Sequence, residues 1–178
     1  MVSFAQDSRS PDSDVNLGLH VNSHASAASI GLPAYPGATP YHDPSKKGND
    51  SSLDMGFTFG DVHLSVLVAS YLTGDSPEQV LAFYRKPLSR YGEVLECDHG
   101  KAVGKLTITS SGLTCSDKHD DHVHVQVNGN GNSSDDHELR TGSPHKYRIV
   151  GIDDLKDGKT KFGLVYLELP KVKDGKAQ

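Results

Sequence analysis

One stretch, residues 70–97, constrains the fold more than any other part of the chain. It reads SYLTGDSPEQVLAFYRKPLSRYGEVLEC, in which a strand pattern, a helix start, an amphipathic helix, a helix stop and a second strand pattern follow one another. Ser76 is a typical N-cap, Pro77 suits the first helical position, and Gln79 completes a capping box. The sequence therefore predicts a helix over residues 77–91 that lies between two strands.

The predicted helix has one apolar face, made by residues that recur at three- and four-residue spacing: Val80, Leu81, Tyr84, Leu88 and Tyr91. Gly92 supplies the left-handed residue that ends a helix. Pro87 interrupts the pattern, since proline in a helix interior removes a backbone hydrogen bond and costs about 3 kcal/mol. Because the apolar spacing continues beyond Pro87, the sequence predicts a kinked helix rather than an end.

Alternating apolar residues predict the strands. The patterns cover residues 15–21, 57–59, 62–69, 93–97, 105–109, 113–115, 123–127, 147–152 and 162–169. The strand over 62–69 is expected to be central, and the last two strands to form a long hairpin that closes the sheet. The fold class that follows is α+β: a single, mostly antiparallel sheet of about five to seven strands with one main helix packed on one face.

The composition sets further bounds. With 178 residues, 18 Gly and 9 Pro, the chain fits one turn-rich domain over residues 15–170, with a disordered segment at 1–14 and a solvated tail at 171–178. The net charge of −5 gives no electrostatic drive towards nucleic acid. No apolar run is long enough to form a transmembrane segment, and the first residues do not form a signal peptide.

Two segments carry a resemblance to a known group of proteins. Residues 32–38 read Leu-Pro-Ala-Tyr-Pro-Gly-Ala, and residues 75–85 read Asp-Ser-Pro-Glu-Gln-Val-Leu-Ala-Phe-Tyr-Arg. In these segments, and in the ending over residues 148–166, the chain resembles a family of bacterial exported, lipoprotein-like proteins without an assigned function. The resemblance implies a compact α+β module outside the cytoplasm, periplasmic or secreted, and it implies no catalytic residues. A cytoplasmic location is the alternative.

Cys97 and Cys115 are the only cysteines in the chain. An even count in a small, loop-rich and exported chain favours a disulfide, with each cysteine at the end of a predicted strand. The alternative is two buried free thiols, as a cytoplasmic chain would keep them. A redox pair is not expected, because there is no Cys-x-x-Cys motif.

Histidines are frequent, ten in all, and three of them lie in the run HDDHVH: His119, His122 and His124. His122 and His124 are two residues apart on a predicted strand, so they share a face, and two imidazoles on one face can bind Zn²⁺ or another transition metal. The alternative is a solvated strand face beside an acidic loop. No general base stands at a fixed spacing from these histidines, as it does in H-E-x-x-H.

These patterns leave three hypotheses for function. The first is a non-enzymatic exported module with a structural role or with a protein or small-molecule ligand in the cell envelope. The second is a histidine-based metal-binding protein, and the third is a hydrolase-type enzyme, for which the sequence offers no G-x-S-x-G motif. Tyr35, beside two prolines, is either an exposed recognition residue or, as the sequence favours, a packed one.

Overall fold

The computed structural model describes residues 17–22, 25–41, 52–59, 62–116, 137–154 and 158–170. The segments predicted at 1–14 and 171–178, and the strand pattern at 123–127, lie outside these residues. The domain boundaries therefore stay a prediction.

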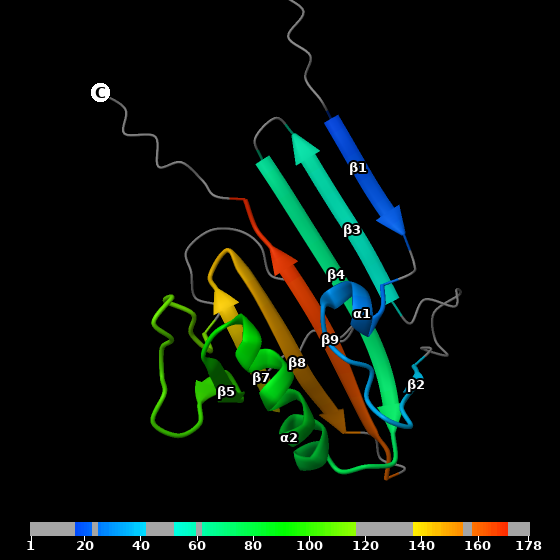
Figure 1. Ribbon diagram of the computed structural model, residues 1–178, viewed down its shortest axis with the longest axis vertical. Helices are drawn as coiled ribbons and strands as arrows, with labels where there is room; N and C mark the ends of the chain where they lie inside the picture. Colours follow the sequence, from blue (N-terminus) through cyan, green and yellow to red (C-terminus); the bar gives the residue numbers. More distant parts are fainter. Residues whose placement is uncertain are drawn as a thin grey trace, which may run out of the picture.

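The described residues form one antiparallel sheet of nine strands (Figure 1). Eight of them follow the order β1-β3-β4-β9-β8-β7-β5-β6, and β2 pairs with β4. The strands are β1 (Leu17–Asn22), β2 (Thr39–Pro40), β3 (Ser52–Phe59), β4 (Val62–Thr73), β5 (Val94–Asp98), β6 (Lys101–Ala102), β7 (His137–Ser143), β8 (Lys146–Asp154) and β9 (Thr160–Glu168). The predicted α+β class is confirmed, although these strands outnumber the five to seven expected.

The main helix, α2 (Pro77–Leu88), begins as predicted. The Ser76 hydroxyl accepts a hydrogen bond from the backbone N–H of Gln79, and the Gln79 side chain accepts one from the backbone N–H of Ser76 at 2.9 Å. Regular α-helix ends one residue after Pro87, and the chain continues as a 3-10 turn, η1 (Ser89–Tyr91). Proline cannot donate to the preceding turn, and the change of helix type follows it directly.

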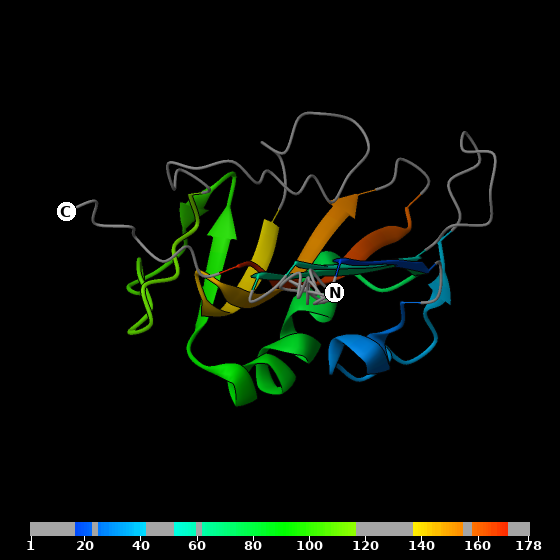
Figure 2. The same cartoon turned by 90° about the horizontal axis from the view of Figure 1, so that it is seen from above.

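Both helices lie on the same side of the sheet (Figure 2). α2 packs on β7 and β8, and the short helix α1 (Ala27–Ile30) packs on β4 and β9. The core between the helices and the sheet includes the predicted apolar face of α2. Val80, Leu81, Tyr84 and Leu88 are at most 2 % exposed there.

The Leu-Pro-Ala-Tyr-Pro-Gly-Ala segment packs into this core. Tyr35 is buried, with its ring centroid 5.0 Å from that of Phe83 and 5.7 Å from that of Phe162. The Tyr84 hydroxyl donates a hydrogen bond to the carbonyl oxygen of Pro33 at 3.1 Å. Tyr35 is therefore a packing residue, as the sequence favoured, and not an exposed recognition residue.

A second apolar cluster faces away from the helices. Since successive strand residues alternate between the two faces, Val66, Val165, Ile149 and Leu167 lie opposite the helix-facing residues next to them. They are buried and pack with Met55, Leu64, Val68 and Tyr147. The sheet thus carries apolar clusters on both faces, which agrees with the position of β4 inside the sheet, between β3 and β9.

The predicted strands need correction at three places in the chain. Residues 105–109 and 113–115 form no strands, because this short segment folds into a turn rather than a paired hairpin. β8 and β9 do form the predicted hairpin, but they lie inside the sheet and do not close it. β7 pairs with β8 on one side and β5 on the other, although none of the predicted strands covers its residues.

Two glycines lie at close approaches, Gly142 to neighbouring backbone and Gly31 to the Tyr91 side chain. A Cβ at Gly142, which has φ +119° at the β7–β8 connection, would lie 2.8 Å from the Cα of Tyr147. A Cβ at Gly31, at the end of α1, would lie 2.5 Å from the Tyr91 hydroxyl, which donates a hydrogen bond to the Gly31 carbonyl oxygen. Both distances are shorter than real Cβ contacts, so a larger residue would displace a neighbour.

Candidate binding site on a disulfide-tethered loop

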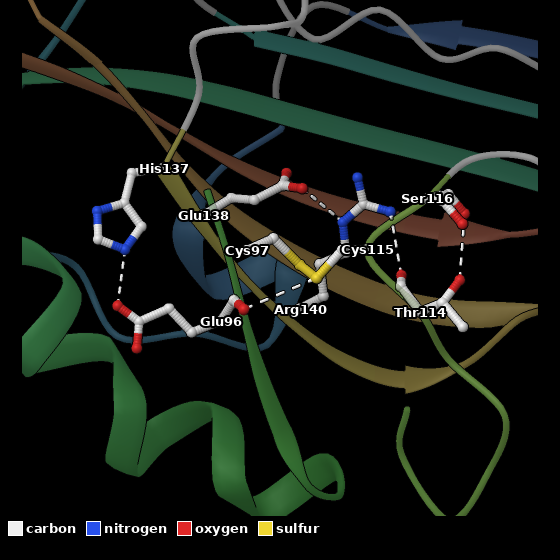
Figure 3. The surroundings of a disulfide bond; sticks show 8 residues. All are labelled: Glu96, Cys97, Thr114, Cys115, Ser116, His137, Glu138 and Arg140. Carbon is white, nitrogen blue, oxygen red and sulfur yellow. Dashed lines mark hydrogen bonds and ion pairs between the residues drawn. A yellow bond between two sulfur atoms is a disulfide. The ribbon is translucent and has the colours of Figure 1, made fainter. Parts of the chain in front are cut away.

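A disulfide joins Cys97 of β5 to Cys115, with the two Cα atoms 5.6 Å apart (Figure 3). This confirms the predicted pairing. The disulfide closes a covalent loop from Cys97 to Cys115. We call residues 103–116 the tethered loop. Both cysteines are buried, at 0 % and 5 % exposed, and pack with Leu95 and with the partly buried Leu106. Burial of both sulfurs indicates a structural bond rather than a reactive redox site.

The loop is entered through a tight hairpin. Asp98 pairs with Lys101 across a two-residue turn in which His99 and Gly100 both have positive φ, 50° and 72°. Two positive φ values are the requirement of a type I′ turn, whose twist matches that of the strands. The backbone N–H of Val103 then donates to the Glu96 carbonyl oxygen at 2.8 Å, which extends the pairing by one residue.

The second half of the tethered loop is anchored. The Thr109 hydroxyl accepts a hydrogen bond from the backbone N–H of Leu113 at 2.9 Å, and both residues are buried. The Glu93 carboxylate accepts a hydrogen bond from the backbone N–H of Ser110 at 2.5 Å, and hydrogen bonds from Ser110 lower the pKa of that carboxyl. Ser111 donates to the carbonyl oxygen of Gly142 on β7. Residues 109–115 are therefore tied to the sheet at several points.

The first half of the loop presents apolar side chains to solvent. Val103 is 43 % exposed and Ile108 is 55 % exposed, and they are the exposed large hydrophobic residues of the described chain. Lys101 and Lys105 beside them are also exposed. Residues 101–116 contain two lysines and no acidic residue, in a chain of net charge −5. The tethered loop and the adjoining strand β6 thus combine aliphatic and basic groups on a covalently closed support.

A polar cluster lies on the other face of β5. Figure 3 shows Glu96 pointing away from the disulfide and towards His137. Glu96 accepts a hydrogen bond from the Arg85 guanidinium of α2, and its other oxygen lies 2.7 Å from Nε2 of His137 on β7. Burial raises the pKa of the Glu96 carboxyl, but the hydrogen bonds and charges of Arg85 and His137 outweigh burial, and the net shift is downward. This cluster ties α2 to two strands.

A buried ion pair lies on the disulfide side of the sheet. Arg140 Nε donates to Glu138 Oε1 at 2.6 Å, and Arg140 also donates to the carbonyl oxygen of Thr114 in the tethered loop at 3.4 Å. Arg140 is 7 % exposed. Cys115 Sγ lies 3.7 Å from the Glu96 carbonyl oxygen, which is a contact only, because a disulfide sulfur carries no proton. The base of the loop is thus held by charge as well as by the disulfide.

The predicted metal ligands His119, His122 and His124 lie outside the described residues, so the metal site stays a prediction. Within residues 17–116 and 137–170, where described, no group of three His, Cys, Asp or Glu side chains is arranged to hold a metal ion. The described helices include none that is long and apolar enough to cross a membrane.

The sequence found the disulfide but missed the side-chain clusters around it. Glu96 and His137 are 41 residues apart, and no spacing signals their contact. Glu138 and Arg140 are two residues apart, so they share a face only if the segment is a strand, and none of the predicted strands covers it. Comparison with known proteins finds no matching family model, no matching curated protein and no matching solved structure.

Proposed function

We propose that this protein is a non-enzymatic module of an oxidising compartment outside the cytoplasm, and that it binds a protein partner through its tethered loop. The observation that supports the proposal is the exposure of Val103 and Ile108 on a loop closed by the Cys97–Cys115 disulfide. A disulfide is consistent with an exported protein, because cytosolic thiols are kept reduced. The resemblance in residues 32–38 and 75–85 points the same way.

The loop is suited to binding because its base is fixed. Disulfide closure and the contacts of Thr109, Ser111 and Thr114 hold the return half in place, so a partner need not order it on binding. Such preorganisation lowers the entropic cost of association. The basic residues Lys101 and Lys105 favour an acidic partner surface, which would also increase the association rate.

Photo-crosslinking tests the proposal in the native envelope. A photoreactive residue replaces Ile108 and, as a control, Lys86, which is exposed on α2. We expect one discrete crosslinked adduct from position 108 and no such adduct from position 86. The protein captured in that adduct should bind the purified wild-type chain, and it should bind the Ile108→Ser variant at least tenfold more weakly. Ile108→Ser should unfold at the wild-type temperature, because its side chain is largely exposed.

Two results would reject the proposal. The first is a protein that fractionates with the cytoplasm and carries two alkylatable thiols. The second is a position-108 adduct profile identical to that of position 86.

A further inference from the structure

Within the part of the chain that the structure describes, the sheet has one long edge without a pairing strand. β1 is the terminal strand of the sheet order, and its inner side pairs with β3 from Leu17↔Phe59 to Asn22↔Asp54. No strand among the described residues pairs with its outer side. In an edge strand every second residue directs its backbone N–H and C=O away from the sheet, which creates a template for another strand. Figure 1 shows β1 and β3 extending beyond both helices.

The sequence of this edge carries none of the usual protection against pairing. β1 reads LGLHVN, with no proline and no Lys, Arg, Asp or Glu, in a chain whose residues are 23 % charged. Natural edge strands that must stay unpaired are short, charged or interrupted by proline. At six residues β1 spans about 20 Å, which is the length of an ordinary strand.

We propose that β1 pairs antiparallel with β1 of a second copy of this chain, so that two sheets join into one across a two-fold axis. The uncharged sequence is the first reason for choosing a second copy. When a strand pairs with a second copy of itself, each residue near the two-fold axis lies opposite the same residue of the other copy, or opposite a residue close to it in sequence. A charged residue there would lie near the same charge in the other copy, which would oppose pairing. β1 avoids this conflict throughout its length.

The register gives the second reason. A two-fold axis perpendicular to the sheet pairs odd positions with odd positions, so centring on Leu19 sets Leu17 opposite Val21 and Leu19 opposite itself. These positions are in register with Phe59, Met55 and Phe57 of β3. By sequence and register, apolar residues are therefore paired with apolar residues across the axis, and cross-strand pairs of aliphatic residues stabilise such a junction.

The far end of the sheet gives the third reason, because it limits assembly to two copies. The last strand there, β6, has only two residues and leads directly into the tethered loop. With one long edge open, β1 pairing uses the same surface on both copies and leaves no equivalent edge for a third. The product is a closed dimer and not a filament. A junction made by one pair of six-residue strands predicts a dissociable dimer.

Sedimentation equilibrium of the full chain over a wide concentration series tests this proposal. We expect a shift with concentration from the chain mass of 19.1 kDa to twice that mass. His20→Lys and His20→Glu each place like charges beside the axis, so each variant alone should be monomeric. An equimolar mixture of the two should dimerise again, and misfolded variants could not produce that recovery. At low concentrations, where the wild type is also monomeric, both should keep the wild-type unfolding temperature.

Several results would overturn the proposal. They are a wild-type chain that stays monomeric at millimolar concentration, variants that dimerise as well as the wild type, a mixture that does not recover, or a mass that rises beyond two copies. The test is independent of the tethered loop, because Ile108→Ser should leave the dimer unchanged.

Discussion

At the scale of single residues, two buried threonines differ in what their hydroxyls contact. Thr141 on β7 is fully buried, and its hydroxyl has no hydrogen-bond partner among the described groups. Thr109 in the tethered loop is 4 % exposed, and its hydroxyl accepts a hydrogen bond from the backbone N–H of Leu113. Burying a polar group costs free energy unless a hydrogen bond compensates for it.

This difference predicts opposite effects for the same substitution. Thr141→Val should leave the free energy of unfolding unchanged or raise it by about 1 kcal/mol, because it removes an uncompensated hydroxyl. Thr109→Val should lower it by about 1–2 kcal/mol, because it leaves the Leu113 N–H without its acceptor. Urea unfolding of both variants measures the two changes. Equal losses in the two variants would contradict the assignment.

The sequence did not show which of the two threonine hydroxyls makes a hydrogen bond. Both occur in polar surroundings, at SSDDHELRTGS and LTITSSG. The hydrogen bond of Thr109 depends on a local turn, and the isolation of Thr141 depends on β7, which enters the sheet only through its pairing with β5 and β8.

At the scale of elements, Glu96 links α2 to β5 and β7 through Arg85 and His137. The pKa of Glu96 is lowered in the folded protein, whereas an unfolded glutamate has a pKa of about 4.3. A carboxyl of this kind stabilises the fold above its unfolded pKa, and the contribution is lost as the pH falls through the lower folded pKa.

Glu96→Gln should therefore change the acid limb of the stability profile. At neutral pH the variant should unfold at a lower urea concentration than the wild type. Below the folded pKa of Glu96 the two midpoints should converge, because both side chains are then neutral. Urea midpoints measured from neutral pH downward test this. A constant difference between the two proteins at every pH would show that the cluster contributes by packing alone.

Local signals predicted α2 well and the loop after β5 poorly. Ser76, Pro77 and Gln79 act within one turn, so their effect could be inferred from sequence alone. Residues 105–115 alternate like strands, but the disulfide and the bonds at Thr109 and Ser111 fold them into a compact loop. Tertiary contacts of this kind override weak strand propensity.

At the scale of the whole molecule, the disulfide fixes one end of the sheet. Closing a chain segment with a sequence separation of 18 residues stabilises a fold by about 3 kcal/mol in the loop-entropy description. A variant with Cys97→Ala and Cys115→Ala should lose about this much free energy of unfolding. Reductant should lower the urea midpoint of the wild type towards that of the variant and leave the variant unaffected. A wild-type midpoint insensitive to full reduction would contradict this prediction.

The fold class could be predicted from the sequence, but the pairing order of the strands could not. The patterns at 62–69, 147–152 and 162–169 identified β4, β8 and β9 because both faces of these strands are substantially apolar. β7 was missed because HELRTGS contains a buried ion pair instead of an apolar alternation. Arg140 pairs with Glu138 and with the Thr114 carbonyl oxygen, which helps to compensate for its buried charge and which no local pattern reveals.

The close approaches at Gly31 and Gly142 have a consequence for tracing ancestry. An added methyl would collide with the backbone of Tyr147 at Gly142, and Gly31 has a φ of +83°, which strains any other residue, so substitution is disfavoured at both positions. Homologous proteins should therefore keep glycine at these two positions and keep both cysteines, even where most of their other residues differ. Those four positions form a fingerprint by which distant kin can be detected when overall identity has faded.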